Sequence, residues 1–228
     1  LLHKLARQVI IELEHNKKTE DDIRKIVFQW RSLIANKVYK QMMAHFKLNE
    51  PDYIKPNVKP FTKIEEWNFT TLKNEGQKDY RDESFPAVQV PKYVFRGFEK
   101  SCHFEYKFDS RTEQTFSFIL ENDNVVLKWL RPAQNQFRLW WNNNSKLYLP
   151  DFIAETEDCI YMIETKASNE LMTSEVQEKA KSAVKYCKYA TEFTAENNGK
   201  PWKYVLIPHD NVSKNNSFKG IVLPYKLK

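Results

Sequence analysis

Two carboxylates and one lysine are the residues of this sequence whose types and spacing best suit chemistry. Glu164 and Lys166 end the otherwise apolar run from 160 to 166 (IYMIETK), which predicts a strand. Because side chains alternate along a strand, these two residues face the same side of the sheet. Asp151 lies thirteen positions before Glu164, a separation that two adjacent strands and a short turn can span. We therefore expect the two carboxylates to meet.

Phosphodiester hydrolysis is the chemistry that this set would support. Paired carboxylates are hard oxygen ligands for Mg²⁺, which keeps several waters and bridges to phosphate oxygens. A lysine beside them can orient or deprotonate a metal-bound water and stabilise charge on the scissile phosphate. The alternative is a surface salt-bridge cluster at a sheet edge, which would add little stability. The apolar strands that carry Asp151, Glu164 and Lys166 favour the catalytic interpretation.

The region from residue 101 to 228 contains the elements that would position these residues, and we assign it as one domain. Apolar periodicity and turn residues predict a helix, four strands, a second helix and a last strand. In chain order they span residues 110–121, 125–130, 137–141, 148–154, 160–165, 174–190 and 204–207. This order predicts an α/β fold with a mixed central sheet flanked by helices.

Two segments precede this domain. Apolar residues at helical spacing predict two amphipathic helices over about residues 1–47, so residues 1–50 are expected to be a helical extension or a linker from an upstream domain. Thr19, with acidic residues behind it, is typical of a helix start. Residues 51–100 contain five prolines and no sustained period, which predicts a connecting segment lying against other structure.

The carboxylates and the lysine also carry a family resemblance. Pro150-Asp151 followed by Glu164-Thr165-Lys166 resembles the motif of the PD-(D/E)xK nuclease superfamily without a substitution. The likeness extends over about residues 95–208, which are similar to the C-terminal endonuclease region of the restriction subunits of type III restriction enzymes. The segments that carry it are 108–113, 125–132, 150–166, the helix through Lys179 and Cys187, and 201–208.

The resemblance implies a restriction-endonuclease-like fold, an activity and a role for each site residue. Asp151 and Glu164 would bind Mg²⁺, for which Mn²⁺ could substitute, and the backbone carbonyl of Thr165 would assist. Lys166 would act on the attacking water. The reaction implied is endonucleolytic hydrolysis of duplex DNA.

Two acidic residues of the predicted helix 110–121 compete for a third acidic position. The resemblance implies that Glu113 reaches the metal, through a water molecule. The alternative for Glu113 is structural, because the helix dipole favours an acidic residue in a first turn. Glu121 is the rival candidate, and we expect it at a solvated helix end.

Partners follow from the same resemblance. Enzymes of that family carry an ATP-driven motor ahead of the nuclease and work with a DNA methyltransferase subunit. The chain contains no G-x-x-x-x-G-K-[ST] phosphate loop, so ATP would be used only by a motor upstream of Leu1. The missing initiator methionine is consistent with a piece of a longer protein. A double-strand cut would require a second nuclease domain.

Composition is compatible with these expectations. Lysine and arginine outnumber aspartate and glutamate by 36 to 30, a mild excess that favours a polyanionic partner. Three separated cysteines support neither a disulfide framework nor a zinc site, so a reducing cytoplasm is expected. No apolar run is long enough to cross a bilayer.

Two other functions stay open. One is a DNA-binding or structural module of the same fold that does not cut, and the other is a repair or phage-defence nuclease outside restriction.

Other conspicuous side chains have structural interpretations. Aromatic residues in strands usually pack in the core, which we expect of Trp129, Trp140 and Trp141. Lys179, Lys181 and Lys185 lie on the exposed side of the predicted helix 174–190. Such lysines usually keep a helix solvated, and the alternative is that they bind phosphates of a nucleic acid. Cysteines at apolar positions are expected to be buried, namely Cys159 and Cys187.

Overall fold

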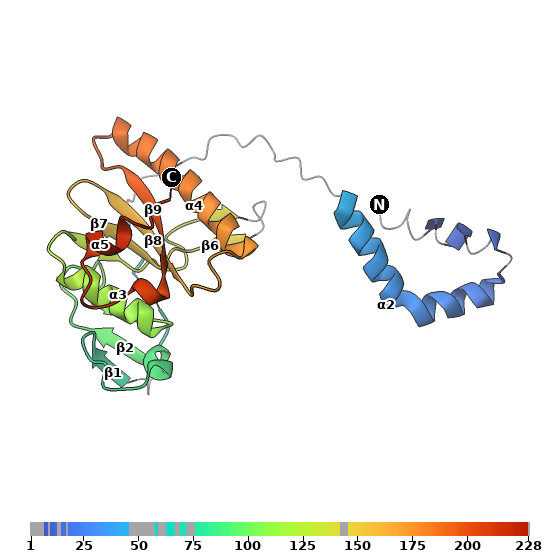
Figure 1. The fold of residues 1–228 in the computed structure, drawn as a ribbon, viewed down its shortest axis with the longest axis horizontal. Coiled ribbons are helices and arrows are strands. Elements are labelled where there is room, and N and C mark those ends of the chain that lie inside the picture. The colour runs from blue at the N-terminus through green and yellow to red at the C-terminus, as the bar shows by residue number, and fades with distance from the viewer. Residues whose placement is uncertain are drawn as a thin grey trace. The chain divides into compact units, whose positions relative to one another are not determined.

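The computed structural model describes most of the 228-residue chain and divides it into two compact units, Leu1–Asp52 and Tyr53–Lys228 (Figure 1). The described residues are 7–8, 10–12, 15–16, 18–45, 58, 63–66, 69–71, 76–141 and 146–227.

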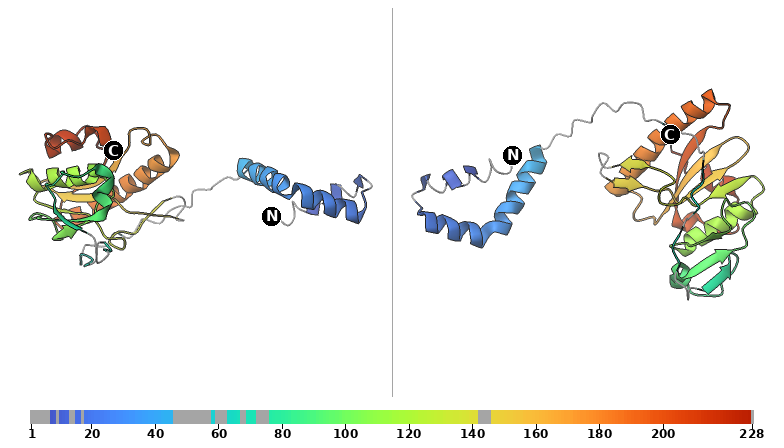
Figure 2. Two further views of the ribbon diagram at one scale, coloured as in Figure 1. Left: turned by 90° about the horizontal axis from the view of Figure 1, so that it is seen from below. Right: turned by 180° about the vertical axis from the view of Figure 1, so that it is seen from behind.

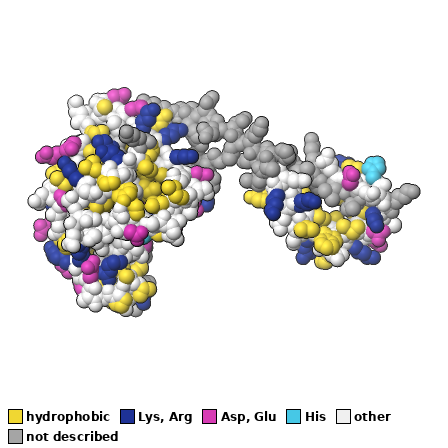
Figure 3. Space-filling view, in the orientation of Figure 1, with side chains coloured by type: hydrophobic (Ala, Val, Ile, Leu, Met, Phe, Trp, Pro, Cys, Tyr) yellow, Lys and Arg dark blue, Asp and Glu magenta, His cyan; other side chains and the backbone are white. Residues whose placement is uncertain are grey.

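The first unit contains the long helix α2, Glu20–His45. Thr19 begins it as expected: its hydroxyl accepts a hydrogen bond from the Asp22 backbone N–H, and the Asp22 carboxylate accepts one from the Thr19 N–H. Several large apolar side chains of α2 are exposed, including Phe28 and Leu33, and hydrophobic atoms are visible on this unit in Figure 3. Of the first predicted helix, residues 7–8 and 10–12 are helical, and the rest lies outside the described residues.

A four-stranded mixed sheet forms the centre of the second unit, with strand order β4-β7-β8-β9. Strands β4, β7 and β8 pair antiparallel, whereas β9 pairs parallel to β8 because the helix α4 crosses over between them. The bounds are β4 Lys128–Leu130, β7 Phe152–Glu155, β8 Ile160–Lys166, α4 Ser174–Glu196 and β9 Trp202–Pro208.

Helices cover both faces of this sheet, which gives three layers (Figures 1 and 2). One face packs against α3, Arg111–Asn122, and the short helix α5, Phe218–Val222. The other face packs against α4, whose buried side is made mostly of small residues and brings the helix close to the sheet. Those residues are Val176, Ala180, Ala183, Cys187 and Ala190. Alternating positions of each strand therefore enter two different cores.

A second sheet corrects the expectation for residues 51–100. Residues 76–96 are not a mere connector, since they form β1 (Gly76–Asp79), the 3₁₀ helix η1 (Ala87–Lys92) and β2 (Tyr93–Arg96). Strand β2 also pairs with β3 (Glu105–Tyr106), so this sheet crosses the predicted boundary at residue 101. The prolines suggested a loop, but aromatic residues before Pro86 and after Pro91 enter the core around α3. They are Tyr80, Phe85, Phe95 and Phe98.

The predicted strand 148–154 is two strands. Residues 149–151 interrupt it, because Pro150 lacks the N–H that a ladder needs. Strand β6 (Lys146–Tyr148) pairs with β5 (Leu139–Trp141) as a separate hairpin, while β7 joins the central sheet. The packing role expected of Trp140 was wrong, because this side chain is 46% exposed.

The remaining expectations for the core were correct. Trp129 and Trp141 are buried, as are Cys159 and Cys187. The fold is mixed α/β, as the element order predicted. Among the helices in the described part of the chain, none has the length and apolar character needed to cross a membrane.

Candidate functional site

Asp151 and Glu164 lie opposite each other at the adjoining ends of two antiparallel strands. Strands β7 and β8 pair Phe152 with Ile163, and continuing this register by one residue places Asp151 opposite Glu164. The break at Pro150 ends β6, so Asp151 lies at the start of β7. The structure thus brings together the two carboxylates that are thirteen positions apart in the sequence.

Thr165 holds the Asp151 carboxylate. Its backbone N–H donates to Asp151 Oδ2 at 2.8 Å, and its hydroxyl donates to the same oxygen at 2.9 Å. Thr165 is buried and Asp151 is half-buried, so both bonds are partly shielded from water. Both bonds end on Oδ2, and the second carboxylate oxygen of Asp151 is not used by Thr165.

Glu164 is buried, only 5% exposed, and it is bound from two sides. Lys166 Nζ lies 3.0 Å from Oε1, and the Tyr148 hydroxyl donates to Oε2 at 3.0 Å. Burial, followed by repulsion from Asp151, raises the pKa of Glu164 to about 8, although Lys166 and Tyr148 act in the opposite direction. A buried carboxylate with a second carboxylate near it attracts a cation, because a cation would stabilise the ionised form of both.

Glu113 lies at the same end of the domain but has a different partner. It belongs to the first turn of α3, begun by Ser110, whose hydroxyl accepts from the Glu113 N–H at 3.2 Å. Its Oε2 receives a hydrogen bond from the guanidinium of Arg131 at 2.5 Å, and Arg131 also binds Asp109 at 2.7 Å. Burial raises the pKa of Glu113 to about 7, with Arg131 opposing and Asp151 adding to the rise. Glu113 is therefore repelled electrostatically by Asp151 while it is paired with Arg131.

The structure brings together two of the groups that were expected to hold a metal ion, the carboxylates of Asp151 and Glu164, and the Thr165 backbone carbonyl would be the third. Within the described residues, no three His, Cys, Asp or Glu side chains are grouped so as to hold a metal ion. Mg²⁺ is commonly bound through one or two carboxylates plus waters and phosphate oxygens, so the pair of Asp151 and Glu164 suits it. Arg131 and the Asp109 N–H both donate to Oε2 of Glu113, so a role at a metal would fall to Oε1.

Glu121 was wrongly expected at a solvated helix end. It is buried and accepts three hydrogen bonds, from the backbone N–H of Glu99 at 2.5 Å and of Lys100 at 2.8 Å, and from Trp129 Nε1 at 2.7 Å. These hydrogen bonds connect the 97–100 turn and β4 to α3. Because its lone pairs are used in this way, Glu121 has a structural role.

Two residues of the site were not singled out from the sequence, Tyr148 and Arg131. Tyr148 stands two positions before Pro150, and Arg131 follows the apolar run of β4 directly. A charged residue at the end of a buried strand is a signal that could have identified Arg131, by the argument used for Glu164. Tyr148 carries no such signal, because a strand tyrosine is ordinarily explained by packing.

Charged side chains outside the site are mixed. On the face of the second unit turned to the viewer in Figure 3, lysine and arginine side chains are interspersed with aspartate and glutamate.

No family model matches the chain, and neither do any of the curated proteins or solved structures with which it was compared. Its class is therefore defined by its own geometry: a mixed α/β protein with an acidic pair and a lysine where β7 and β8 meet.

Proposed function

We propose that this chain is a Mg²⁺-dependent endonuclease that hydrolyses phosphodiester bonds of duplex DNA. The observation that carries the proposal is the register of Asp151 opposite Glu164, with the Lys166 ammonium group 3.0 Å from the Glu164 carboxylate. Two acidic groups and a lysine at one end of a sheet are the parts that metal-assisted phosphodiester hydrolysis needs.

The resemblance to the PD-(D/E)xK superfamily supports the same activity. The motif residues Pro150, Asp151, Glu164 and Lys166 occupy adjacent ends of β7 and β8. A central mixed sheet with α3 on one face and α4 on the other is compatible with the restriction-endonuclease-like fold that the motif implies. We extend the proposal to this fold.

Each residue of the site would then have a defined task. Asp151, Glu164 and the Thr165 carbonyl would hold the metal, with Mn²⁺ able to replace Mg²⁺. The metal, when bound, would supply Lewis-acid stabilisation of the phosphate and lower the pKa of water. Lys166 would hydrogen-bond the attacking water and stabilise negative charge on the phosphate oxygens. Tyr148 would orient Glu164 through the bond already present.

The native setting that we propose is the cleavage module of a type III restriction enzyme. There the chain would follow an ATP-driven motor and act with a DNA methyltransferase subunit that recognises the site. Cutting both strands would then take a second nuclease domain. A nuclease of repair or phage defence would use the same residues without these partners.

One observation favours a second candidate, a DNA-binding module that does not cut. Glu113, the third acidic residue implied by the resemblance, is paired with Arg131. A site limited to two carboxylates could have lost its chemistry and kept its fold. Intact Asp151, Glu164 and Lys166 argue for the nuclease.

Cleavage of a supercoiled plasmid in Mg²⁺ or Mn²⁺ tests the proposal directly. The wild-type chain should nick or linearise the plasmid, and Asp151→Ala should not. Asp158→Ala is the matched control, because this exposed acidic residue lies in the β7–β8 turn, at the other end of the same strands. Cleavage that survives Asp151→Ala contradicts the assignment, and absence of cleavage by the wild-type chain supports the non-cutting module.

A further inference from the structure

Two lysines from different elements lie against one buried tryptophan. Lys146 Nζ, from β6, is 5.1 Å from the centroid of the Trp141 ring, and Lys179 Nζ, from α4, is 5.0 Å from it. Trp141 is buried, so its ring is a fixed support for both ammonium groups. Lys179 is also less solvated than a surface lysine, with its side chain 23% exposed.

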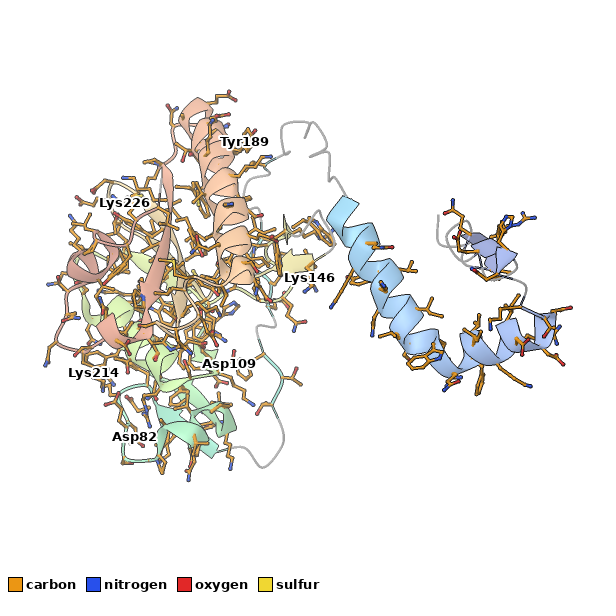
Figure 4. All side chains as sticks on the ribbon, turned by 45° about the vertical axis from the view of Figure 1, so that its right-hand side comes forward. Asp82, Asp109, Lys146, Tyr189, Lys214 and Lys226 are labelled. Carbon is orange, nitrogen blue, oxygen red and sulfur yellow. The ribbon has the colours of Figure 1, made fainter. Side chains whose placement is uncertain are left out.

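This pair of lysines lies beside the candidate nuclease site. Lys146 and Tyr148 are two positions apart in β6 and so point to the same face of the hairpin, and Tyr148 binds Glu164. The β5–β6 hairpin packs against α4, and Figure 4 shows Lys146 on the hairpin beside the beginning of that helix. Lys166 approaches the same region from the end of β8.

Acidic side chains neutralise the lysines of this region only in part. Glu175 Oε1 lies 2.7 Å from Lys179 Nζ, and the Glu175 side chain is 56% exposed. The bond from Lys179 lowers the pKa of Glu175, and the charges of Lys146 and Lys166 lower it further, so three lysines act on one carboxylate. Within the part of the chain that the structure describes, Lys146 forms no ion pair. Lys179 thus already binds one carboxylate, that of Glu175.

We propose that Lys146 and Lys179, held against Trp141, form an accessory site for a backbone phosphate of the DNA substrate, next to the phosphate that is cut. The inference rests on the proposed function and deepens it by assigning residues that bind the substrate without taking part in the chemistry. A phosphate is the ligand class that fits, because compact ammonium groups bind it as point charges. The duplex would then contact the protein through the β5–β6 hairpin and the start of α4.

The ordinary alternative is that these lysines only keep α4 solvated. Lys181 provides the matched control, since it lies on the same helix two positions from Lys179, on a different side, and is exposed. Lys146→Gln and Lys179→Gln keep long polar side chains and remove the charge. Neither residue is in the buried core, so the variants are expected to keep the melting temperature, which is checked first.

The test is the salt dependence of binding to a short fluorescent DNA duplex, measured with EDTA so that binding is separated from cleavage. Losing this one phosphate contact in the double variant should reduce the slope of log Kd against log salt concentration by about 1, and each single variant should reduce it by less. Lys181→Gln should leave the slope unchanged. In Mg²⁺, the double variant should raise KM roughly tenfold, more than it lowers kcat.

The outcomes separate this inference from the proposed nuclease. A reduced slope for the Lys146 and Lys179 variants alone supports the accessory site, even if the wild-type chain fails to cut the plasmid. An unchanged slope, or an equal reduction in Lys181→Gln, overturns the accessory site. Metal-dependent cleavage by the wild-type chain would then still support the nuclease.

Discussion

Thr165 binds Asp151 with its backbone N–H at 2.8 Å and with its hydroxyl at 2.9 Å, and both bonds end on Oδ2. The residue between the two candidate catalytic side chains of β8 therefore orients the acidic residue at the start of β7. Since alternate residues of a strand face opposite sides, Thr165 points away from Glu164 and Lys166 and toward the α3 side. The proposed site thus extends through the sheet edge, with contributions from both faces.

Replacing Thr165 by valine should weaken this orientation. Thr165→Val keeps the shape of the side chain and the backbone bond but removes the bond at 2.9 Å. Loss of a hydrogen bond worth about 1 kcal/mol should reduce kcat for plasmid cleavage by roughly fivefold. Thr156→Val is the control, because its buried hydroxyl bonds to Cys159 in the β7–β8 turn. Equal loss of activity in both variants would mean that Thr165 acts only through stability.

The two buried acidic residues of α3 should respond differently to substitution by glutamine. Glu121→Gln disturbs three hydrogen bonds to Glu99, Lys100 and Trp129, and should lower the free energy of unfolding by about 1–3 kcal/mol. The Mg²⁺ concentration for half-maximal cleavage should stay the same. Glu113→Gln should raise that concentration, because it removes a charge that interacts with Asp151. Denaturant unfolding and Mg²⁺ titration of cleavage measure the two effects, and the opposite pattern would exchange their assigned roles.

Stability without divalent metal should fall as the pH rises through the neutral range. The folded-state pKa of Glu164 is raised from 4.5 to about 8, so the folded protein binds more protons than the unfolded chain between these values. The free energy of unfolding therefore decreases as pH increases across that window, by on the order of a few kcal/mol. Glu113 acts in the same direction, from 4.5 to about 7.

Urea unfolding of the wild-type chain and of Glu164→Gln at several pH values checks this prediction. The variant has no carboxyl group to ionise at position 164, so its free energy of unfolding should decrease less between pH 5 and 8. The decrease that remains should be the one due to Glu113. Identical pH dependence in the two proteins would show that Glu164 is not the group responsible.

Removing the Tyr148 hydroxyl should shift the pH dependence of cleavage. Tyr148→Phe keeps the buried ring and deletes the donor to Glu164, a bond that lowers the Glu164 pKa. The pKa of Glu164 should rise, so the ionised form that binds metal appears at higher pH. The rising limb of the pH–rate profile should move to alkaline pH. Tyr161→Phe, which contacts Phe218 in the α3-side core, should leave the profile in place. A profile unmoved by Tyr148→Phe would contradict this role.

The sequence by itself determined most elements and the local pattern of the candidate site. Period-two alternation and helical spacing predicted α3, β8 and β9 to within two residues, because each is amphipathic or continuously apolar over its length. The start of α4 was also correct, but the helix continues to Glu196, beyond its predicted end at residue 190. The spacing of Asp151 and Glu164 correctly predicted that the carboxylates meet, since a tight turn between adjacent strands leaves little freedom.

Tertiary structure decided what local patterns cannot encode. Aromatic residues on either side of Pro86 and Pro91 become core only because α3 offers a face to cover. Glu121 is buried because two distant N–H groups and the Trp129 indole converge on it. The pairing of Glu113 with Arg131 and the placement of Lys146 and Lys179 on Trp141 likewise join separate elements. Charge pairing and burial depend on distances in space, which sequence separation does not set.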